Sequence, residues 1–288
     1  MTPDRAIRTV HTVAALRAQI QQWRAAGDKI ALVPTMGALH AGHVALMNAA
    51  RERAERAIVT IFVNPTQFAP TEDLSRYPRT LEADLAKAEA AGVDVAFVPD
   101  VGEMYPEGFC TTISLAGPAL ELETSFRPTH FAGVATVVAK LLLQALPDVA
   151  LFGEKDYQQL QVVTRLARDL DLPVQIVGVP TVREPDGLAM SSRNVYLSTA
   201  DRATAAILHR ALSQAAERIA RERKVEAAVE EARAAVCAAG FQLDYLEARH
   251  AETLAPINGA DDGPIRLLVA ARIGATRLID NVSVPTLT

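Results

Sequence analysis

The chain has 288 residues, a formal net charge of −5 at pH 7 and a hydrophobic share of 50%. This length predicts one large or two ordinary domains, and the composition supplies enough apolar side chains for a packed core. The acidic balance argues against a nucleic-acid partner, because proteins that bind nucleic acid usually carry a basic face. No apolar run reaches the length of a membrane span, so we expect no membrane association.

The amino terminus and the two cysteines indicate a cytoplasmic protein. Residues 1–8 lack the apolar core of a secretory signal. Cys110 and Cys237 lie far apart in the sequence, and neither belongs to a metal-ligand spacing. They could pair in principle, but in a reducing cytosol we expect two buried, unpaired thiols, Cys110 in a strand and Cys237 in a helix.

Helices and buried strands alternate through the first two thirds of the chain. Ile30–Val33 and Ala57–Val63 are continuously apolar, which is typical of strands buried on both faces of a parallel sheet. Further strands are expected at residues 93–98, near 111–115, at 149–152 and at 174–179. Helices are expected at residues 13–26, 43–55, 81–91 with Thr80 as N-cap, 134–145, and from the loop 153–156 to 170. This order predicts an α/β fold with a doubly wound parallel sheet.

The character of the sequence changes after Arg183. Ser198, with Asp201 three residues later, is the predicted N-cap of a long helix that ends near Arg221. A second helix is expected at 225–239, and two or three strands follow at 243–249, 265–273 and 276–281. Helices followed by hairpin-forming strands predict a smaller α+β domain. We therefore expect domains at residues 1–184 and 185–288, the second closing over a site at their junction.

The turn after Ile30–Val33 carries the clearest functional signal. Gly37 follows the apolar run, and helical spacing resumes at Val44, so His40 and His43 fall in the strand-to-helix turn and the first helical turn. Ligands bind at the carboxyl ends of the strands in an open parallel sheet, and helix N-termini favour phosphate. The sequence therefore predicts a nucleotide phosphate bound by backbone amides and two imidazoles. Two surface loop histidines are the simpler alternative.

Three further polar clusters lie at strand ends or at the domain junction. They are Asn64 with Gln67, Lys155 with Asp156 and Gln159, and Ser191 with Ser192 and Arg193. Lys155 and Arg193 supply positive charge suited to a polyphosphate. The two glutamines could bind hydroxyl and carboxylate oxygens of a small polar substrate. Each cluster alone could be a solvated loop or a helix cap, but their convergence on one crevice favours function.

The long irregular region at residues 99–130 ends in Arg127 and His130, which could bind a second carboxylate or simply form a surface turn. No strand is followed by a dinucleotide fingerprint or a phosphate-binding P-loop. The spacing of His40 and His43 differs from a zinc motif, and no third ligand is near. We therefore expect no protein-bound metal, only Mg²⁺ carried by the nucleotide phosphates.

Five motifs resemble one known family. They are Val-Pro-Thr-Met-Gly-Ala-Leu-His-Ala-Gly-His (33–43), Ile-Phe-Val-Asn-Pro-Thr-Gln-Phe (61–68), Tyr-Pro-Arg-Thr-Leu (77–81), Phe-Gly-Glu-Lys-Asp-Tyr-Gln-Gln-Leu (152–160) and Met-Ser-Ser-Arg-Asn-Val-Tyr-Leu (190–197). The first is similar to the histidine motif of the adenylyl-transferring, Rossmann-like superfamily that includes class I aminoacyl-tRNA synthetases. Together the five resemble the pantothenate synthetase (pantoate–β-alanine ligase) family over most of residues 29–200.

The resemblance implies ATP-dependent condensation of pantoate with β-alanine through a pantoyl adenylate, with release of AMP and pyrophosphate, in a homodimer. It implies that His43 is the proton donor. His40, Lys155 and Arg193 are further candidate catalytic groups, because departure of pyrophosphate requires neutralisation of negative charge. The residues implied for pantoate are Gln67 and Gln159, with Gln67 also near β-alanine, and the polar loop residues Asn64 and Arg127 are our further candidates for substrate contacts. Those implied for ATP are Met36, Gly37, Ala38, Leu39, His40, Ala41, Gly42, His43, Gly153, Glu154, Lys155, Asp156, Val182, Met190, Ser191, Ser192 and Arg193.

The sequence also allows other functions. A nucleotidyltransferase on the same fold would leave AMP in its product, whereas a ligase releases it. A non-catalytic regulator would bind ATP without forming pyrophosphate. A fragment of a tRNA-reading synthetase would need a basic surface, which the net charge of −5 does not supply.

Overall fold

The computed structural model describes residues 6–70 and 72–285, and the chain folds into two compact units. The first unit comprises Met1–Leu115, Arg127–Glu154 and Val162–Pro180. The second comprises Ala116–Phe126, Lys155–Gln161 and Thr181–Thr288. Two short stretches from the middle of the chain therefore fold with the carboxyl-terminal part. The domain boundary between residues 184 and 185 stays a prediction.

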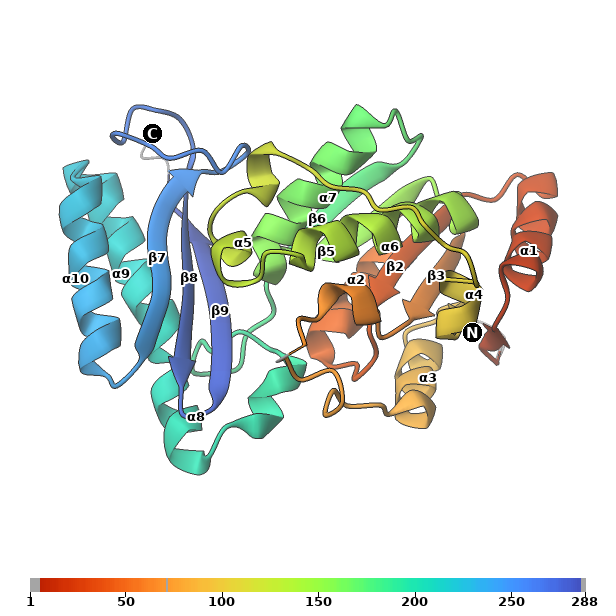
Figure 1. Ribbon diagram of the computed structural model, residues 1–288, viewed down its shortest axis with the longest axis horizontal. Helices are drawn as coiled ribbons and strands as arrows, with labels where there is room; N and C mark the ends of the chain where they lie inside the picture. The colour runs from red at the N-terminus through yellow and green to blue at the C-terminus, as the bar shows by residue number, and fades with distance from the viewer. Residues whose placement is uncertain (1–5, 71, 286–288) are drawn as a thin grey trace. The chain divides into compact units, whose positions relative to one another are not determined.

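The first unit contains a six-stranded parallel sheet in the order β1-β4-β3-β2-β5-β6 (Figure 1). The strands are β1 (Arg8–Val10), β2 (Ile30–Thr35), β3 (Arg56–Ile61), β4 (Val95–Phe97), β5 (Val149–Gly153) and β6 (Gln175–Val179). After β2 the chain proceeds to β3 and β4 on one side, then returns to pair β5 with the other edge of β2. The carboxyl ends of β2 and β5 thus form the point where the strand order reverses, which is where open α/β sheets bind ligands.

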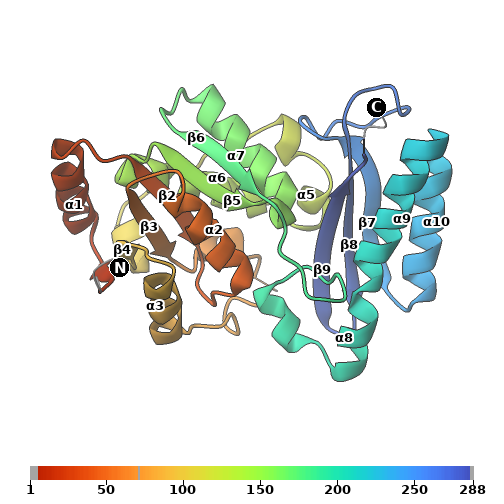
Figure 2. The same ribbon diagram turned by 180° about the vertical axis from the view of Figure 1, so that it is seen from behind.

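Crossover connections distribute the helices over both faces of this sheet. The helices are α1 (Val13–Ala25), α2 (Ala41–Arg51), α3 (Leu81–Ala90), α4 (Val101–Met104), α6 (His130–Ala145) and α7 (Tyr157–Asp169), of which α7 begins in the second unit. α2 packs against β2, β3, β5 and α3, whereas α6 packs against β2 and α1 (Figure 2). The helical spacing predicted from Val44 onward buries Leu46, Met47 and Ala50 of α2 in the core beside β2.

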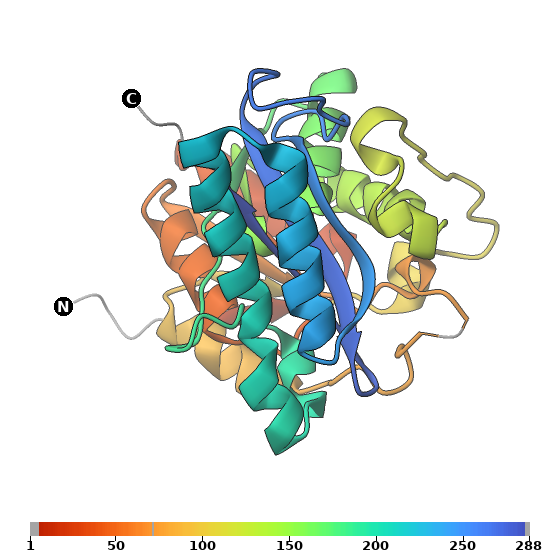
Figure 3. The same cartoon turned by 90° about the vertical axis from the view of Figure 1, so that its left-hand side faces the viewer.

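The second unit is built on an antiparallel sheet in the order β7-β8-β9. Its elements are α5 (Glu123–Phe126), α8 (Thr199–Ala205), α9 (Ile207–Glu222), α10 (Val225–Ala238), β7 (Gln242–His250), β8 (Ile265–Ile273) and β9 (Thr276–Ser283). α9 and α10 lie side by side over one face of the sheet (Figure 3), where Leu212 and Val236 pack with Leu267. On the other face, Leu122 and Tyr157 pack against Leu268 and Tyr245.

The predicted fold class, a doubly wound parallel sheet followed by a smaller α+β unit, is confirmed. The strand expected near residues 111–115 was wrong, because this segment pairs with no described strand and the N–H of Ile113 donates to Thr136 Oγ1. The single helix expected between Ser198 and Arg221 is two helices, α8 and α9, with Ala206 between them. No proline or glycine marks that break, so the spacing could not reveal it. β1 was not predicted.

Local capping and exposure also differ in part from the predictions. Ser198 is the N-cap of α8, as predicted, and its Oγ accepts the N–H of Asp201. Thr80 is the N-cap residue of α3, as predicted, but its side chain makes no capping hydrogen bond. Both cysteines are unpaired, but they are exposed rather than buried, and Cys110 lies outside any strand. In the described part of the chain, no helix is long and apolar enough to span a membrane.

Candidate active site

His40 and His43 together cap the start of α2 at the carboxyl end of β2. His40 is the N-cap residue, and its Nδ1 atom accepts the backbone N–H of Gly42 at 3.1 Å. The Nδ1 atom of His43 accepts the backbone N–H of His40 at 3.2 Å. This reciprocal arrangement is a capping box in which two imidazoles replace the usual hydroxyl and carboxylate. Their ring centroids are 4.1 Å apart, so the rings lie against one another.

The capping bonds determine which ring nitrogen carries the proton. A backbone N–H is always a donor, so the Nδ1 atom of each histidine must be the acceptor and must be unprotonated. In each neutral ring the proton therefore resides on Nε2, the nitrogen that the cap does not use. Two imidazole N–H donors and the positive end of the α2 dipole are thus combined at one helix N-terminus, and this arrangement suits an anion.

The turn before this helix adopts an unusual backbone conformation. Gly37 has φ +82° and Ala38 has φ +51°, so two successive residues lie in the left-handed region. A Cβ at residue 37 would approach Asp84 Oδ2 to 3.1 Å, which is a second reason for glycine there. Ala38 incurs a conformational cost of about 1 kcal/mol, so neighbouring contacts must hold it in place.

Asp84 and Lys87 of α3 supply those contacts. The Asp84 side chain accepts the N–H of Ala38 at 2.9 Å and that of Leu39 at 2.7 Å, and the residue is only 1% exposed. The Nζ atom of Lys87 donates to the carbonyl of Leu39 at 2.6 Å. Neither residue was predicted from the sequence. Their only local signal was an acid and a base on one helical face, which is more simply a solvated ion pair.

Gln67 lies at the carboxyl end of the adjacent strand, in a short 3₁₀ turn (Pro65–Gln67). Its Nε2 atom lies 3.1 Å from the sulfur of Met36, so the predicted substrate residue contacts the turn that carries the histidines. The Nδ2 atom of Asn64 donates to Gln67 Oε1 at 3.1 Å, and Tyr105 donates its hydroxyl to Asn64 Oδ1 at 2.8 Å. These bonds orient the amide of Gln67, and they assign Asn64 a positioning role within this structure.

Helix α6 packs unusually closely against the same turn. A Cβ at Gly133 would lie 2.5 Å from the carbonyl oxygen of Thr66 and 2.8 Å from Gln67 Cα, closer than atoms of a real side chain approach backbone. The carbonyl of Gly133 also accepts from Asn64 Nδ2 at 3.2 Å. At the start of α6, His130 Nδ1 lies 3.0 Å from the carbonyl oxygen of Gln67. The backbone of Gln67 is therefore held in place by α6.

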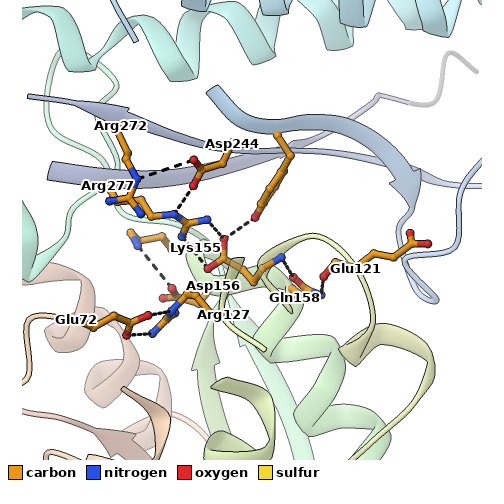
Figure 4. A network of polar contacts seen from close by, with 11 residues as sticks. Glu72, Glu121, Arg127, Lys155, Asp156, Gln158, Asp244, Arg272 and Arg277 are labelled. Carbon is orange, nitrogen blue, oxygen red and sulfur yellow. Dashed lines mark hydrogen bonds and ion pairs between the residues drawn. The ribbon is translucent and has the colours of Figure 1, made fainter. Parts of the chain in front are cut away.

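Arg127 lies beside Gln67, but its guanidinium is engaged by an acidic side chain. Its Nε and Nη2 atoms donate to the two carboxylate oxygens of Glu72 at 2.6 and 2.8 Å (Figure 4). Burial raises the pKa of Glu72. The hydrogen bond and charge of Arg127, together with the charge of His130, lower it by more than burial raises it, so the pKa of Glu72 lies below its usual value. Substrate binding by Arg127 stays a prediction. It requires Glu72 to give up at least one of its two hydrogen bonds to the guanidinium, or the substrate to bind the remaining N–H groups.

In the second unit, Lys155 and Asp156 belong to a 3₁₀ turn (Glu154–Asp156) that precedes α7. The Nζ atom of Lys155 is 3.6 Å from Asp156 Oδ1, a partly exposed ion pair (Figure 4). Gln159 is half-buried in the first turn of α7. Its neighbour Gln158 is buried, accepts the N–H of Glu123 and donates to the carbonyl of Pro118, so it anchors the segment 116–126.

The segment with Ser191, Ser192 and Arg193 follows a small hairpin in the same unit. In the hairpin stem the N–H of Met190 donates to the carbonyl of Val182 at 3.0 Å. Ser191 is the N-cap of a 3₁₀ helix (Ser192–Tyr196), and its Oγ accepts the N–H of Arg193 at 3.3 Å. Ser191 therefore does cap a helix, which was the alternative to a role in ligand binding. Capping does not remove the hydroxyl group, which can still accept or donate further bonds.

Each unit thus brings together part of the predicted site. The first gathers the histidine turn, Met36, Asn64 and Gln67 at neighbouring strand ends. Gly153 ends β5, the strand beside β2, and Glu154 follows it. In the second unit, Lys155 accepts a hydrogen bond from β9 through its backbone carbonyl. The hairpin that includes Val182 is also bonded to β9, through the side chain of Arg183. The donors are imidazoles, hydroxyls, an ammonium and a guanidinium, a set that suits anionic oxygens.

Comparisons with known proteins agree with this chemistry. The family model for pantoate-beta-alanine ligase matches residues 8–283. Pantothenate synthetase of Nitrobacter winogradskyi is 59% identical over 99% of this chain and 100% of its own. The crystal structure of pantothenate synthetase from Thermus thermophilus has a TM-score of 0.91 at 50% identity and covers 96% of this chain and 99% of its own.

A further solved relative is pantoate-beta-alanine ligase from Francisella tularensis, complexed with beta-gamma ATP and beta-alanine. It is 33% identical with a TM-score of 0.81, and it covers 96% of this chain and 98% of its own. The chain belongs to the pantoate–β-alanine ligase family. It is a carbon–nitrogen ligase that condenses pantoate with β-alanine to form pantothenate at the expense of ATP, releasing AMP and pyrophosphate.

Proposed function

We propose that the ligase works through a pantoyl adenylate and that the predicted site residues carry out its two steps. In the first step a carboxylate oxygen of pantoate attacks the α-phosphorus of ATP, a P–O bond forms, and pyrophosphate leaves. In the second the amine of β-alanine attacks the acyl carbon, the C–N bond forms, and AMP leaves with the oxygen that joined it to the acyl group. The capping box of His40 and His43 at the strand-order reversal is the observation that carries this proposal.

The first step requires charge neutralisation rather than a general base. A carboxylate is already ionised at neutral pH, so pantoate needs no activation by proton removal. Negative charge grows on the departing pyrophosphate, and the Nε2–H groups of His40 and His43 are suited to donate to phosphate oxygens. Their capping bonds support this role, because they hold the donating nitrogens in one orientation before ATP binds. His43 is the proposed proton donor.

Lys155 and Arg193 are the proposed cationic groups for the triphosphate. Lys155 provides a point charge and Arg193 a planar fork, and Ser191 and Ser192 add neutral donors. The remaining proposed ATP contacts are Met36–His43, Gly153–Asp156, Val182 and Met190–Arg193, as the family resemblance implies. Many of these contacts would come from backbone groups, which suits a nucleotide whose phosphates accept from N–H donors.

Gln67 and Gln159 are the proposed pantoate ligands, with Asn64 and Arg127 in the same region of the substrate site. The buried amide of Gln67, oriented by Asn64 at 3.1 Å, supports this role because a substrate hydroxyl or carboxylate would not have to reorder it. Gln67 is also proposed to lie near β-alanine. The amine of β-alanine must lose a proton before it attacks, since it is mostly ammonium at pH 7.

ATP, its metal ion and the assembly complete the proposal. The complex of the Francisella relative with beta-gamma ATP and beta-alanine supports binding of ATP and β-alanine by this chain. Among residues 6–70 and 72–285, no three or more histidine, cysteine, aspartate or glutamate side chains form a group fit to hold a metal. We propose that Mg²⁺ is bound by the ATP phosphates and by water. We also propose a homodimer, as the family resemblance implies, located in the cytoplasm and with domains at 1–184 and 185–288, as the composition and the sequence pattern predict.

An isotope experiment tests the adenylate. The protein is incubated with ATP, Mg²⁺, β-alanine and pantoate labelled with ¹⁸O in its carboxylate. If pantoyl adenylate forms, one labelled oxygen passes from pantoate to AMP. Without β-alanine, one equivalent of pyrophosphate per site should still appear in a single turnover. Formation of ADP, or AMP without label, would exclude this route.

A second experiment tests the proposed residues. Lys155→Ala should lower the single-turnover rate of pyrophosphate release about a hundredfold or more, because one well-placed donor contributes about 3 kcal/mol to such a transition state. Arg193→Ala should act in the same direction. A Lys155→Ala variant that released pyrophosphate at the wild-type rate would show that this ammonium does not serve the first step.

A further inference from the structure

Asp280 and Asn281 are adjacent, buried residues of β9, and each bonds to a different segment of the second unit. Asp280 is 4% exposed and Asn281 is 3% exposed. Side chains alternate along a strand, so the two point to opposite faces of the β7–β9 sheet. Leu278 and Val282, which share the face of Asp280, pack in the core that contains α9. Ile279, which shares the face of Asn281, packs with Tyr157.

Asp280 holds the hairpin that leads to Met190 and Ser191. Its two carboxylate oxygens accept from Arg183 Nη1 at 2.7 Å and from Nη2 at 2.9 Å, a bidentate pair. Arg183 pairs with Ala189 across the hairpin, and its Nη1 also donates to the carbonyl of Gly187 at 3.0 Å. The guanidinium therefore joins the first strand and the turn of the hairpin to β9.

Asn281 holds the turn that carries Lys155. Its Nδ2 atom donates to the carbonyl of Lys155 at 2.9 Å. Its Oδ1 atom accepts from Arg266 Nε at 2.7 Å, so the amide cannot rotate without losing both bonds. The guanidinium of Arg266 lies 4.0 Å from the ring centroid of Tyr157, two residues after Lys155. The start of α7 is thus attached to β8 and β9 at two points.

We propose that Asp280 and Asn281 are positioning residues for the first step of the reaction, Asn281 acting through Lys155 and Asp280 through Arg183 and the Met190–Arg193 segment. This inference rests on the proposed roles of Lys155 and Arg193. The two segments approach the triphosphate from separate parts of the chain, yet both take their position from neighbouring residues of one strand. A shift of about 1 Å in either segment is enough to cost about a hundredfold in rate.

Asn281→Asp is the sharpest variant, because it keeps the size of the side chain and the acceptor for Arg266. It replaces the Nδ2 donor by an oxygen that faces the carbonyl of Lys155, so the hold on Lys155 is lost selectively. Asp244→Asn is the matched control. Asp244 is a largely buried acid of β7 in the same sheet, with a side chain that is 9% exposed, and it pairs with Arg277 at 2.7 Å (Figure 4). Lys155→Ala and the double variant Lys155→Ala with Asn281→Asp complete a double-mutant cycle.

We expect Asn281→Asp to slow single-turnover pyrophosphate release about tenfold to a hundredfold, while added pantoyl adenylate reacts with β-alanine at nearly the wild-type rate. Asp244→Asn should lower the melting temperature without this split between the steps. In the Lys155→Ala background, Asn281→Asp should change pyrophosphate release less than about twofold, because the ammonium it positions is absent. Asp280→Asn should slow the first step in either background.

Equal slowing of both steps by Asn281→Asp, or an undiminished effect in the Lys155→Ala background, would overturn the proposal. If Asn281→Asp does not fold, Arg266→Lys replaces it in the same cycle, because it weakens the other bond of Asn281. The Lys155→Ala variant by itself distinguishes a failure of the proposed role of Lys155 from a failure of the proposed role of Asn281. A wild-type rate in that variant rejects the proposed role of Lys155, whereas additivity in the cycle rejects only the role of Asn281.

Discussion

His43 accepts the backbone N–H of His40 through Nδ1 at 3.2 Å, so the second histidine holds the residue that caps the helix they share. The two side chains therefore have a structural role and a proposed chemical role, and they use different ring nitrogens for them. Nδ1 completes the start of α2, and Nε2 is the nitrogen proposed to donate to phosphate. These two roles can be separated by substitutions that keep the cap but remove the imidazole.

His40→Asn and His43→Gln should separate the cap from the chemistry. Asparagine is a favoured N-cap residue, and glutamine is a usual third residue of a capping box, so both variants should unfold at nearly the wild-type temperature. In both variants the single-turnover rate of pyrophosphate release should fall about a hundredfold or more. His40→Ala is the contrasting variant, since it should also lose about 1 kcal/mol of stability. Fast pyrophosphate release by His43→Gln would mean that the imidazole serves only the helix.

Asp84→Asn should disturb the histidine turn from outside it. The Asp84 carboxylate accepts the N–H groups of Ala38 and Leu39, and an asparagine amide cannot accept both with equal geometry. We expect a loss of about 1–3 kcal/mol in unfolding free energy. We also expect a slower first step, because Gly37 and Ala38 would no longer be held in the left-handed region.

Asp94→Asn is the matched control for Asp84→Asn. Asp94 is also a largely buried carboxylate that accepts a backbone N–H, that of Ala57, but it immediately precedes β4 and contacts the amino end of β3. Its loss should reduce stability measured by chemical denaturation and leave the rate of pyrophosphate release per folded site unchanged. If both variants affected that rate equally, the effect of Asp84 would be one of general stability.

Gln67→Ala should raise the KM for pantoate by about tenfold or more, with a smaller change in the KM for ATP. The reason is the loss of an oriented amide that would otherwise bind substrate oxygens without reordering. Gln144→Ala is a suitable control, because Gln144 is buried to a similar degree in the same unit but lies near the end of α6. Steady-state kinetics with varied pantoate decide the matter, and an unchanged KM would remove Gln67 from the pantoate site.

Gly133→Ala should mimic part of this effect without touching a polar group. Alanine normally stabilises a helix by about 1 kcal/mol relative to glycine. Here its Cβ would lie 2.5 Å from the carbonyl oxygen of Thr66, so the turn that carries Gln67 must move. We expect lower stability and a raised KM for pantoate. Gly102→Ala in α4, where the nearest atom would be 3.4 Å away, should not lower the stability and should leave the KM for pantoate unchanged.

The Glu72–Arg127 pair predicts a particular dependence of stability on pH. Burial raises the pKa of Glu72, but Arg127 and His130 lower it more, so the folded-state pKa lies below the ordinary value of 4.5. A lowered pKa means that the pair stabilises the fold above about pH 4.5 and that this contribution is lost as the pH falls through the folded-state pKa. Glu72→Gln should therefore be less stable than wild type at about pH 6–7, by a difference that shrinks toward about pH 3.

Chemical denaturation of both proteins between about pH 3 and 7 measures this difference. Glu55→Gln is a control, since the pKa of Glu55 is also lowered, by the N–H of Lys29, but the side chain is fully exposed. Any pH-dependent difference should be smaller for that variant. A constant difference between wild type and Glu72→Gln across the whole range would show that packing, and not ionisation, is responsible.

The amino-acid sequence by itself determined the elements and the location of the histidine pair. Continuous apolar runs predicted β2 and β3, and helical spacing after Gly37 predicted α2, because these patterns depend on residues close together in the chain. The position of His40 and His43 at a strand end followed directly. The order of strands and helices also predicted the doubly wound sheet, since crossover rules leave few other topologies.

The tertiary structure decided which side chains hold those elements in place. Asp84 is 45 residues from Leu39, and Asn281 is 126 residues from Lys155, so no local pattern could pair them. For the same reason the sequence missed that residues 116–126 and 155–161 fold with the carboxyl-terminal unit, and that residues 111–115 lack a strand partner within the described chain. Local periodicity specifies an element, whereas hydrogen bonds between distant segments depend on how the chain folds back on itself.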